Sequence, residues 1–274
     1  PQSVQEQVNK ELEIGHPYGI TKDEWLKIYD KIVSEVDGDV PLDRKGAHVL
    51  FVPGKRSLTD NLQGVISTIE VLIKAKEDFT LSSNLWSACM STYDIGAWDE
   101  MRILTERRDK IIRELNVKRL LLSQDACGFY GWRWVADKVL GRRLGYGVLD
   151  FSELVYEYLK EGRITLKPDK NDFKATYHDP CHLARKGGVV KEPRVVLKKA
   201  VKELVEMPNS GVYSICCTAG CLRVDEYKDT RVRSFKVKLD DILATNAEVV
   251  ITNCDECFAQ FVEMFPHYKV ENIK

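Results

Sequence analysis

Short apolar runs alternate in the first half of the chain with segments whose apolar positions recur at helical spacing. Residues 48–52 (HVLFV) and 118–123 (KRLLLS) are predicted as buried strands, and Pro53-Gly54 ends the first of them. Residues 59–76 are predicted as a helix, because one face gathers Leu62, Val65, Ile66, Ile69, Leu72 and Ile73. Further helices are expected over about 96–115 and from near Phe129.

The second half of the chain repeats this alternation. Strands are predicted at 174–178, 212–215 and 248–252, and Asp179-Pro180 ends the first of these. Helices are predicted around 192–206, through 234–246 and from near Asp255. Strands that alternate with helices are typical of an α/β fold with a mainly parallel sheet in each half.

Three landmarks recur along the chain at nearly one offset. LLLSQDACGF at 120–129 matches VVITNCDECF at 249–258, Ala88-Cys89 matches Cys216-Cys217, and Pro53-Gly54 matches Pro180-Cys181. Such an offset indicates an internal duplication, although two unrelated α/β units can also look alike.

We therefore expect two tandem pseudo-symmetric α/β domains, at 46–150 and 151–274. The polar residues 1–45 are predicted as a helical N-terminal extension, in which Thr21 caps a helix and Glu24 follows three residues later.

Bulk composition narrows the class of protein. The chain has 44% hydrophobic and 30% charged residues, which suits a globular protein with a sizeable core, and its formal net charge is only −1. That balance gives no reason to expect nucleic acid as a partner. No signal peptide or transmembrane segment is recognised, so a cytoplasmic location is expected, with membrane association only through partners.

Cysteine is the residue type that points to chemistry. Six of the eight cysteines follow residue 180, and five of them are spaced C-x34-C-C-x36-C-x-x-C: Cys181, Cys216, Cys217, Cys254 and Cys257. In a reducing compartment such thiols favour metal binding or redox chemistry over disulfides. Each group follows a predicted strand, and the carboxyl ends of parallel strands share one sheet edge, so the five thiols are expected to converge.

The number of thiols favours an iron–sulfur cluster over zinc. Structural zinc takes four tetrahedral ligands, whereas here there are five, and Cys216 and Cys217 are adjacent. A cluster offers several metal corners to thiolates from different directions. A zinc-stabilised scaffold, or inert core cysteines, stay as alternatives.

The motifs HDPCHL (178–183), CC (216–217) and NCDEC (253–257) resemble the cysteine-rich CCG repeat of B-type heterodisulfide reductase subunits and their relatives. Those relatives include subunits of thiol:fumarate reductase and of glycerol-3-phosphate dehydrogenase, lactate-utilisation proteins and the heterodisulfide-reductase-like complexes of sulfur oxidisers. The resemblance covers about 46–270 as two repeats. It implies that the five cysteines bind one non-cubane [4Fe-4S] cluster, at which thiol or disulfide chemistry takes place.

The first repeat departs from that pattern. Pro53-Gly54, Ala88, Asp125 and Gly128 stand where ligands are expected, and only Cys89 keeps its register, with Cys127 displaced by one residue. The first site is therefore expected to hold no five-cysteine cluster, and a smaller site at Cys89 and Cys127 is an alternative.

Four further features have both a structural and a functional interpretation. Cys221 is either a small buried side chain or a thiol that forms a mixed disulfide, and His178 and His182 either complete local structure or serve the cluster. Phe129, Tyr130, Trp132 and Trp134 are interpreted as core rather than a quinone surface, and Arg185-Lys186-Gly187-Gly188 as a solvated basic turn. No G-x-G-x-x-G follows a strand, so flavin or nicotinamide would sit on a partner.

The leading interpretation is an iron–sulfur subunit of a heterodisulfide-reductase-like oxidoreductase complex that acts on thiols, disulfides or persulfides. The resemblance implies a ferredoxin-like iron–sulfur subunit and a flavin-containing subunit as partners, and His182 is a candidate catalytic residue beside the five cysteines. The alternative is a non-catalytic electron-transfer subunit of another dehydrogenase, for an organic acid or glycerol phosphate.

Overall fold

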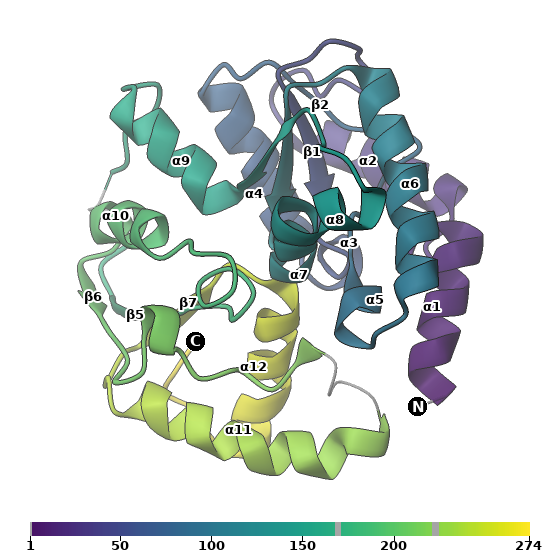
Figure 1. The fold of residues 1–274 in the computed structure, drawn as a ribbon. Helices are drawn as coiled ribbons and strands as arrows, with labels where there is room; N and C mark the ends of the chain where they lie inside the picture. The colour runs from purple at the N-terminus through teal and green to yellow at the C-terminus, as the bar shows by residue number, and fades with distance from the viewer. Residues whose placement is uncertain (1, 168–170, 221–224) are drawn as a thin grey trace. The chain divides into compact units, whose positions relative to one another are not determined.

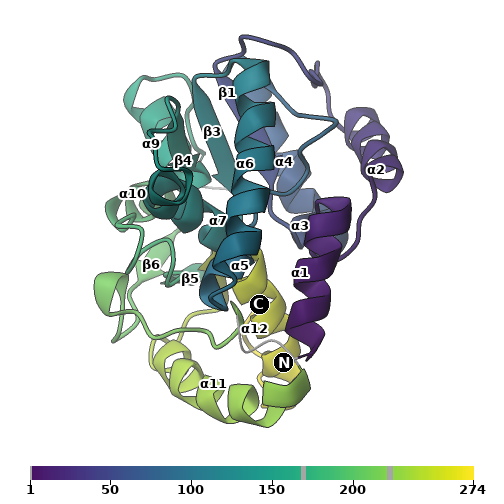
Figure 2. The ribbon, with the colours of Figure 1, turned by 45° about the vertical axis from the view of Figure 1, so that its right-hand side comes forward.

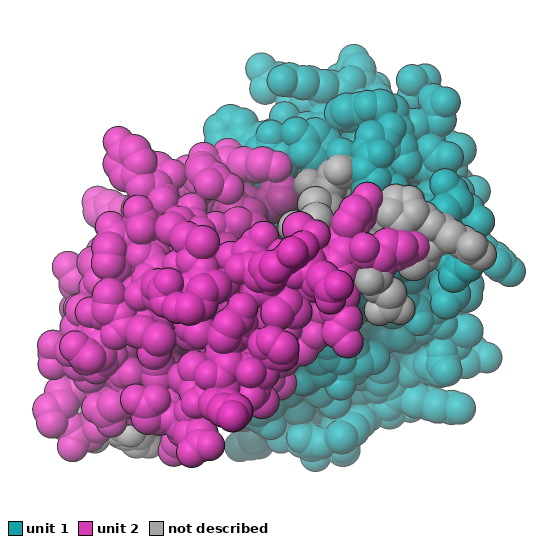
Figure 3. Space-filling model, turned by 90° about the horizontal axis from the view of Figure 1, so that it is seen from below, with its two compact units in different colours: residues 1–151 teal, residues 152–274 magenta. Residues whose placement is uncertain are grey.

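The computed structural model describes residues 2–167, 171–220 and 225–274 (Figure 1). Its contacts divide the chain into two compact units, residues 1–151 and 152–274, which Figure 3 distinguishes by colour. Each unit is built on its own parallel sheet, with order β2-β1-β3-β4 in unit 1 and β6-β5-β7 in unit 2. The predicted α/β class, with two mainly parallel sheets and a helical N-terminal part, is confirmed.

Unit 1 begins with two helices, α1 (Gln2–Ile14) and α2 (Lys22–Glu35). Helix α2 starts where the sequence predicts, because the Glu24 backbone N–H donates to Thr21 Oγ1 at 3.3 Å and the Thr21 N–H donates to the Glu24 carboxylate at 2.8 Å. The sheet strands of this unit are β1 (Val49–Pro53), β2 (Phe79–Thr80), β3 (Arg119–Ser123) and β4 (Gly147–Asp150).

The helices of unit 1 cover both faces of this sheet. They are α3 (Ser57–Asp60), α4 (Leu62–Lys74), α5 (Ser91–Asp94), α6 (Trp98–Leu115), α7 (Ala126–Tyr130) and α8 (Ala136–Leu140), with a π-helical turn η1 (Gly131–Val135) between the last two. Figure 1 shows α4 to the left of strand β1 and α6 to the right of it, and Figure 2 shows α1 beside α6. The predicted apolar face of α4 is buried at Val65, Ile66, Ile69 and Leu72, against strands β1 and β3 that are almost wholly buried.

Unit 2 has strands β5 (Lys174–His178), β6 (Glu203–Val205) and β7 (Val249–Thr252). Its helices are α9 (Phe151–Lys160), which begins at the unit boundary, α10 (Lys191–Ala200), α11 (Lys228–Leu243) and α12 (Asp255–His267), with short turns η3 (Gly211–Tyr213) and η5 (Asp225–Tyr227). The order β6-β5-β7 repeats the order β2-β1-β3, which agrees with an internal duplication.

Two predicted elements of unit 2 are wrong. The helix expected around 192–206 ends at Ala200, and its last residues form the edge strand β6, which pairs with β5 at three positions. Residues 212–215 form no strand: Gly211 has a φ of +59°, and Ser214 Oγ donates to the Asp179 carbonyl at 2.7 Å. Strands of three residues carry too little periodicity to be told from their surroundings.

Candidate functional site: five thiols at one sheet edge

The register of unit 2 brings two cysteine loops together. Tyr177 pairs with Ile251 and His178 with Thr252, so β5 and β7 end side by side. Cys181 lies just beyond β5, in the turn that follows Pro180. Cys254 lies just beyond β7 at the N-cap of α12, and Cys257 is the third residue of that helix. Parallel pairing thus places three thiols at one edge, as the sequence predicts.

Asp179 fixes the Cys181 loop to the segment before Cys216. Its fully buried carboxylate receives two hydrogen bonds from Arg194, each 2.8 Å long, and a third from the Gly211 N–H at 2.7 Å. Its carbonyl accepts from Ser214 Oγ. The Asp179 contact is also the main reason that the pKa of Arg194 is raised. Asp179 and Arg194 therefore position Cys216 and Cys217, a role that the sequence pattern did not reveal.

Thr218 completes the turn after the CC pair. It has a left-handed φ of +66°, and its N–H points to Cys216 Sγ at 3.3 Å. Its hydroxyl accepts from Gln260 Nε2 at 3.2 Å, and the buried Gln260 in turn accepts from Arg231. Helices α11 and α12 thus hold the loop that carries Cys216 and Cys217 through a buried polar network.

The five sulfur atoms make continuous contact. Cys217 Sγ lies 3.1 Å from Cys257 Sγ, Cys216 contacts both Cys181 and Cys217, and Cys257 also contacts Cys254. Three of these residues, Cys217, Cys254 and Cys257, are buried, whereas Cys181 and Cys216 are half-buried. The structure therefore brings together all five cysteines that the sequence singles out.

The thiols cannot all ionise without a compensating positive charge. The hydrogen bonds from Cys181 and Cys217 lower the pKa of Cys216 to about 2. The contact with Cys216 raises the pKa of Cys181 and of Cys217, and the contact with Cys217 raises the pKa of Cys257. One thiolate shared among crowded thiols is the donor set that a cationic metal core would complete, so the residues fit a cluster.

His178 is the buried histidine of this site. Its ring is fully buried, neither ring nitrogen has a hydrogen-bond partner in the described structure, and one nitrogen lies within 4.8 Å of Cys217 Sγ and Cys257 Sγ. Burial and the nearby Lys238 lower its pKa to about 3, so the ring is neutral. A buried ring without a partner beside thiols indicates a missing acceptor, such as an inorganic sulfide of a cluster.

His182 and the basic turn lie nearer the surface. His182 Nδ1 is 3.6 Å from Cys181 Sγ, and its Nε2 is 3.0 Å from Lys186 Nζ. Arg185 donates to the Ser214 carbonyl at 3.3 Å, so this part of the turn holds the loop before the CC pair. Cys221 lies outside the described residues.

Unit 1 carries a smaller counterpart of the site, with fewer thiols. Cys89, Asp125 and Cys127 each place a ligand atom within 4.8 Å of the others, and Pro53 ends β1 where Asp179-Pro180 follows β5. Two thiols and one carboxylate come together there, against five thiols in unit 2.

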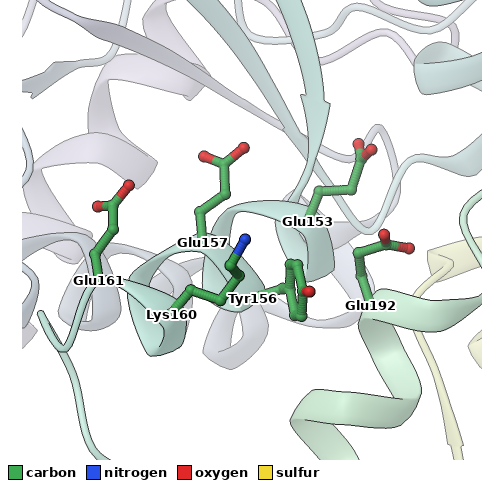
Figure 4. Close-up of a pocket in the computed structure, with 6 residues that line it drawn as sticks. All are labelled: Glu153, Tyr156, Glu157, Lys160, Glu161 and Glu192. Carbon is green, nitrogen blue, oxygen red and sulfur yellow. The ribbon is translucent and has the colours of Figure 1, made fainter.

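The aromatic residues after β3 divide into two sets. Phe129 and Trp132 are fully buried core residues, whereas Trp134 is half exposed and lines an open groove with Tyr93, Trp98 and Tyr130. In unit 2, a separate hollow between α9 and α10 is lined by Glu153, Tyr156, Glu157, Lys160, Glu161 and Glu192 (Figure 4). No cysteine lines it, so it is not part of the thiol site.

Comparison with known proteins agrees with this geometry. Residues 175–262 match the cysteine-rich domain family CCG, a span that contains all five thiols. The predicted resemblance to heterodisulfide-reductase-like CCG proteins is confirmed. The cofactor of this chain is accordingly an iron–sulfur cluster.

Three relatives illustrate the range of similarity. The chain is 28% identical over 228 residues to the D-type subunit of dihydromethanophenazine:CoB–CoM heterodisulfide reductase from Methanosarcina barkeri (strain Fusaro), covering 81% of this chain and 55% of the relative. It is 28% identical over 150 residues to the Hdr-like menaquinol oxidoreductase iron–sulfur subunit of Archaeoglobus profundus, covering 50% and 27%. It is 33% identical over 126 residues to a probable membrane-anchored ferredoxin of Chromohalobacter salexigens, covering 46% and 19%.

The chain thus spans little more than half the length of the Methanosarcina relative, and less of the other two. Subunits of oxidoreductase complexes are the shared context of the first two names. Among the described residues, no helix is both long and apolar enough to cross a membrane.

Proposed function

We propose that this chain is the iron–sulfur subunit of a heterodisulfide-reductase-like complex that carries out thiol–disulfide or related sulfur redox chemistry. The observation that carries the proposal is the set of five contacting thiols at the edge of β5 and β7. Cys181, Cys216, Cys217, Cys254 and Cys257 would hold a [4Fe-4S] cluster, of the non-cubane type, since five thiolates exceed the four that a cubane takes. Such a cluster supplies electrons one at a time and an iron site for sulfur.

The chain's own residues would exclude water on one side of the site and admit substrate on the other. Buried Cys217, Cys254 and Cys257 lie against α12, while half-buried Cys181 and Cys216 face the accessible side. His182 and Lys186 stand beside Cys181, where their N–H groups would attract an anionic thiolate. The catalytic role of His182 stays a prediction.

Electrons would pass between this subunit and ferredoxin-like and flavin-containing partners. The names of the relatives support a complex of several subunits, and the absence of a Gly-rich dinucleotide motif supports a flavin elsewhere. A second candidate is electron transfer without thiol chemistry, which the name of the menaquinol oxidoreductase relative favours.

A spectroscopic titration separates the two candidates. Anaerobically purified protein is oxidised, and EPR spectra are recorded with and without a panel of small thiols, including ethanethiol, cysteine and glutathione. Sulfur chemistry predicts a changed cluster signal with at least one thiol, and a weaker change in His182→Gln. An unchanged signal with every thiol, together with rapid reduction by a reduced ferredoxin, would instead support the electron-transfer role.

A further inference from the structure

Unit 1 contains a pair of thiols that the five-cysteine site does not use. Cys89 Sγ and Cys127 Sγ lie 3.5 Å apart. Cys89 is fully buried, whereas Cys127 is half-buried. A disulfide has an S–S distance of about 2.05 Å, so a closure of about 1.5 Å would join these two sulfurs.

The backbone on the Cys89 side is held firmly. The guanidinium of the buried Arg108 donates to the Cys89 carbonyl and is itself paired with the buried Glu11 at 2.6 Å. Trp132 Nε1 donates to the Ala88 carbonyl at 2.9 Å. A buried ion pair used to anchor one loop carbonyl fixes where the Cys89 thiol points.

The Cys127 side is fixed by the start of α7. Asp125 caps this helix by accepting the Gly128 N–H at 2.9 Å, and Gln124 just before it has a left-handed φ of +62°. Strained backbone of this kind, at a non-glycine residue, clusters at functional sites. The π-helical turn η1 that follows is also enriched at such sites.

A general base lies beside the accessible thiol. A carboxylate oxygen of the buried Asp125 is within 4.8 Å of both sulfurs, and Asp125 interacts with the Cys127 thiol. Burial raises the pKa of Asp125, and the charges of Lys55 and Arg108 oppose that rise. The contact with Cys89 raises the pKa of the Cys127 thiol, so this thiol needs a base beside it, and the Asp125 carboxylate is placed to accept its proton.

We propose that Cys89 and Cys127 form a redox-active dithiol that exchanges with disulfides of small-molecule or protein thiols. The Cys127 proton passes to Asp125, and the Cys127 thiolate attacks R–S–S–R′, forming a Cys127–S–S–R mixed disulfide and releasing R′S⁻. Asp125 passes that proton to the departing R′S⁻ and then accepts the proton of the buried Cys89. The Cys89 thiolate attacks Cys127 Sγ and releases RS⁻. The dithiol is oxidised by two electrons to a Cys89–Cys127 disulfide, and the substrate disulfide is reduced to two thiols.

This inference is independent of the proposed function, because the reaction needs no electron from the cluster. It also assigns roles from burial: the half-buried Cys127 attacks, and the buried Cys89 resolves. The competing use of the same atoms is a metal site with two thiolates and a carboxylate, which the test below must separate.

The test uses the full chain with its cluster, purified anaerobically, and 5,5′-dithiobis(2-nitrobenzoate) as the probe disulfide. Released thionitrobenzoate is counted, free thiols are alkylated, and peptides are mapped by mass spectrometry. The EPR spectrum is recorded in parallel, so that damage to the cluster is seen separately. Cys221→Ser serves as the matched control, because it removes a thiol outside the pair.

The wild type and Cys221→Ser should give a linked Cys89–Cys127 peptide with no retained adduct. Cys89→Ser should keep one thionitrobenzoate on Cys127. Cys127→Ser should react at Cys89 at least about tenfold more slowly, since Cys89 is buried, and Asp125→Asn should slow the first release by about tenfold or more at pH 7.

Two results would overturn the proposal. One is a wild-type protein that retains the adduct on Cys127 without any link to Cys89. The other is a pair of thiols that stay unreactive until a zinc chelator is added, which would make them metal ligands. Should Cys89→Ser fail to fold, Cys89→Ala answers the same question, because alanine brings no hydroxyl into this fully buried position.

Discussion

Breaking the Asp179–Arg194 ion pair should loosen the loops that carry Cys181, Cys216 and Cys217. The Asp179 side chain is fully buried and that of Arg194 is 15% exposed, so Arg194→Met leaves a buried carboxylate with the Gly211 N–H as its remaining donor. Removing one partner of a buried pair costs about 3–5 kcal/mol. The contact of Arg194 with Glu206, which is 41% exposed, adds at most about 1 kcal/mol.

The companion substitutions make a double-mutant cycle. Asp179→Asn keeps the volume and the Gly211 contact, so its cost should be about 1–3 kcal/mol. The double variant has no unpaired buried charge and should be less destabilised than the sum of the two single variants by about 2 kcal/mol.

Urea titrations followed by cluster absorbance measure these changes. With a slope of about 1–3 kcal/mol per M, Arg194→Met should lower the midpoint by roughly 1–5 M. Lys202→Met is the matched control, because its 2.6 Å ion pair with Asp172 is exposed and should contribute little to stability. Equal shifts for Arg194→Met and Lys202→Met, or strictly additive costs in the cycle, would show that the Asp179–Arg194 pair does not hold these loops.

Two further predictions concern buried histidines. His178→Phe should keep the cluster but remove the hydrogen bond that His178 would donate to it. Because a hydrogen bond to a charged group contributes about 1.5 kcal/mol or more, the reduction potential of the cluster should fall by roughly 60 mV. Loss of the cluster would instead make His178 a ligand. Burial and the charges of Arg108 and Lys55 lower the pKa of His16 to about 4, so the folded state resists its protonation. The stabilisation of unit 1 from neutral His16 should thus be fully present above pH 6.5, and the free energy of unfolding should fall by about 3 kcal/mol towards pH 4. Tryptophan fluorescence measures this, since all five tryptophans lie in unit 1. The fall should be less steep in His16→Phe, and parallel pH profiles of wild type and variant would contradict this.

The parts of the fold that sequence predicted are those with strong periodicity. Strand β5 and helix α2 start where apolar pattern and cap residues indicate, and the matching sheet orders agree with the offsets between repeats. The edge strands β2 and β6 have two and three residues, so hydrogen bonding to a neighbouring strand defines them rather than their own composition.

The candidate site likewise has one part that the sequence predicted and one part that it did not. The thiols were recognised because cysteine is rare and its spacing is distinctive, whereas Asp179, Arg194 and Thr218 act through contacts far along the chain. An Asp before a proline indicates a turn, and nothing in its local sequence tells that Arg194, fifteen residues later, binds it. The sequence likewise carries no sign that the ring nitrogens of His178 have no hydrogen-bond partner in the described structure, since a histidine at a strand end is ordinary.

Iron and acid-labile sulfide content, measured together with EPR on anaerobically purified protein, shows whether the five thiols of unit 2 hold an iron–sulfur cluster. The comparison needs the wild type, Cys217→Ser and Cys89→Ser, which remove one thiol from unit 2 and one from unit 1. We expect about four iron and four sulfide per chain in the wild type and in Cys89→Ser, with loss of both in Cys217→Ser. One zinc without sulfide in the wild type, or equal loss in the two variants, would contradict this expectation.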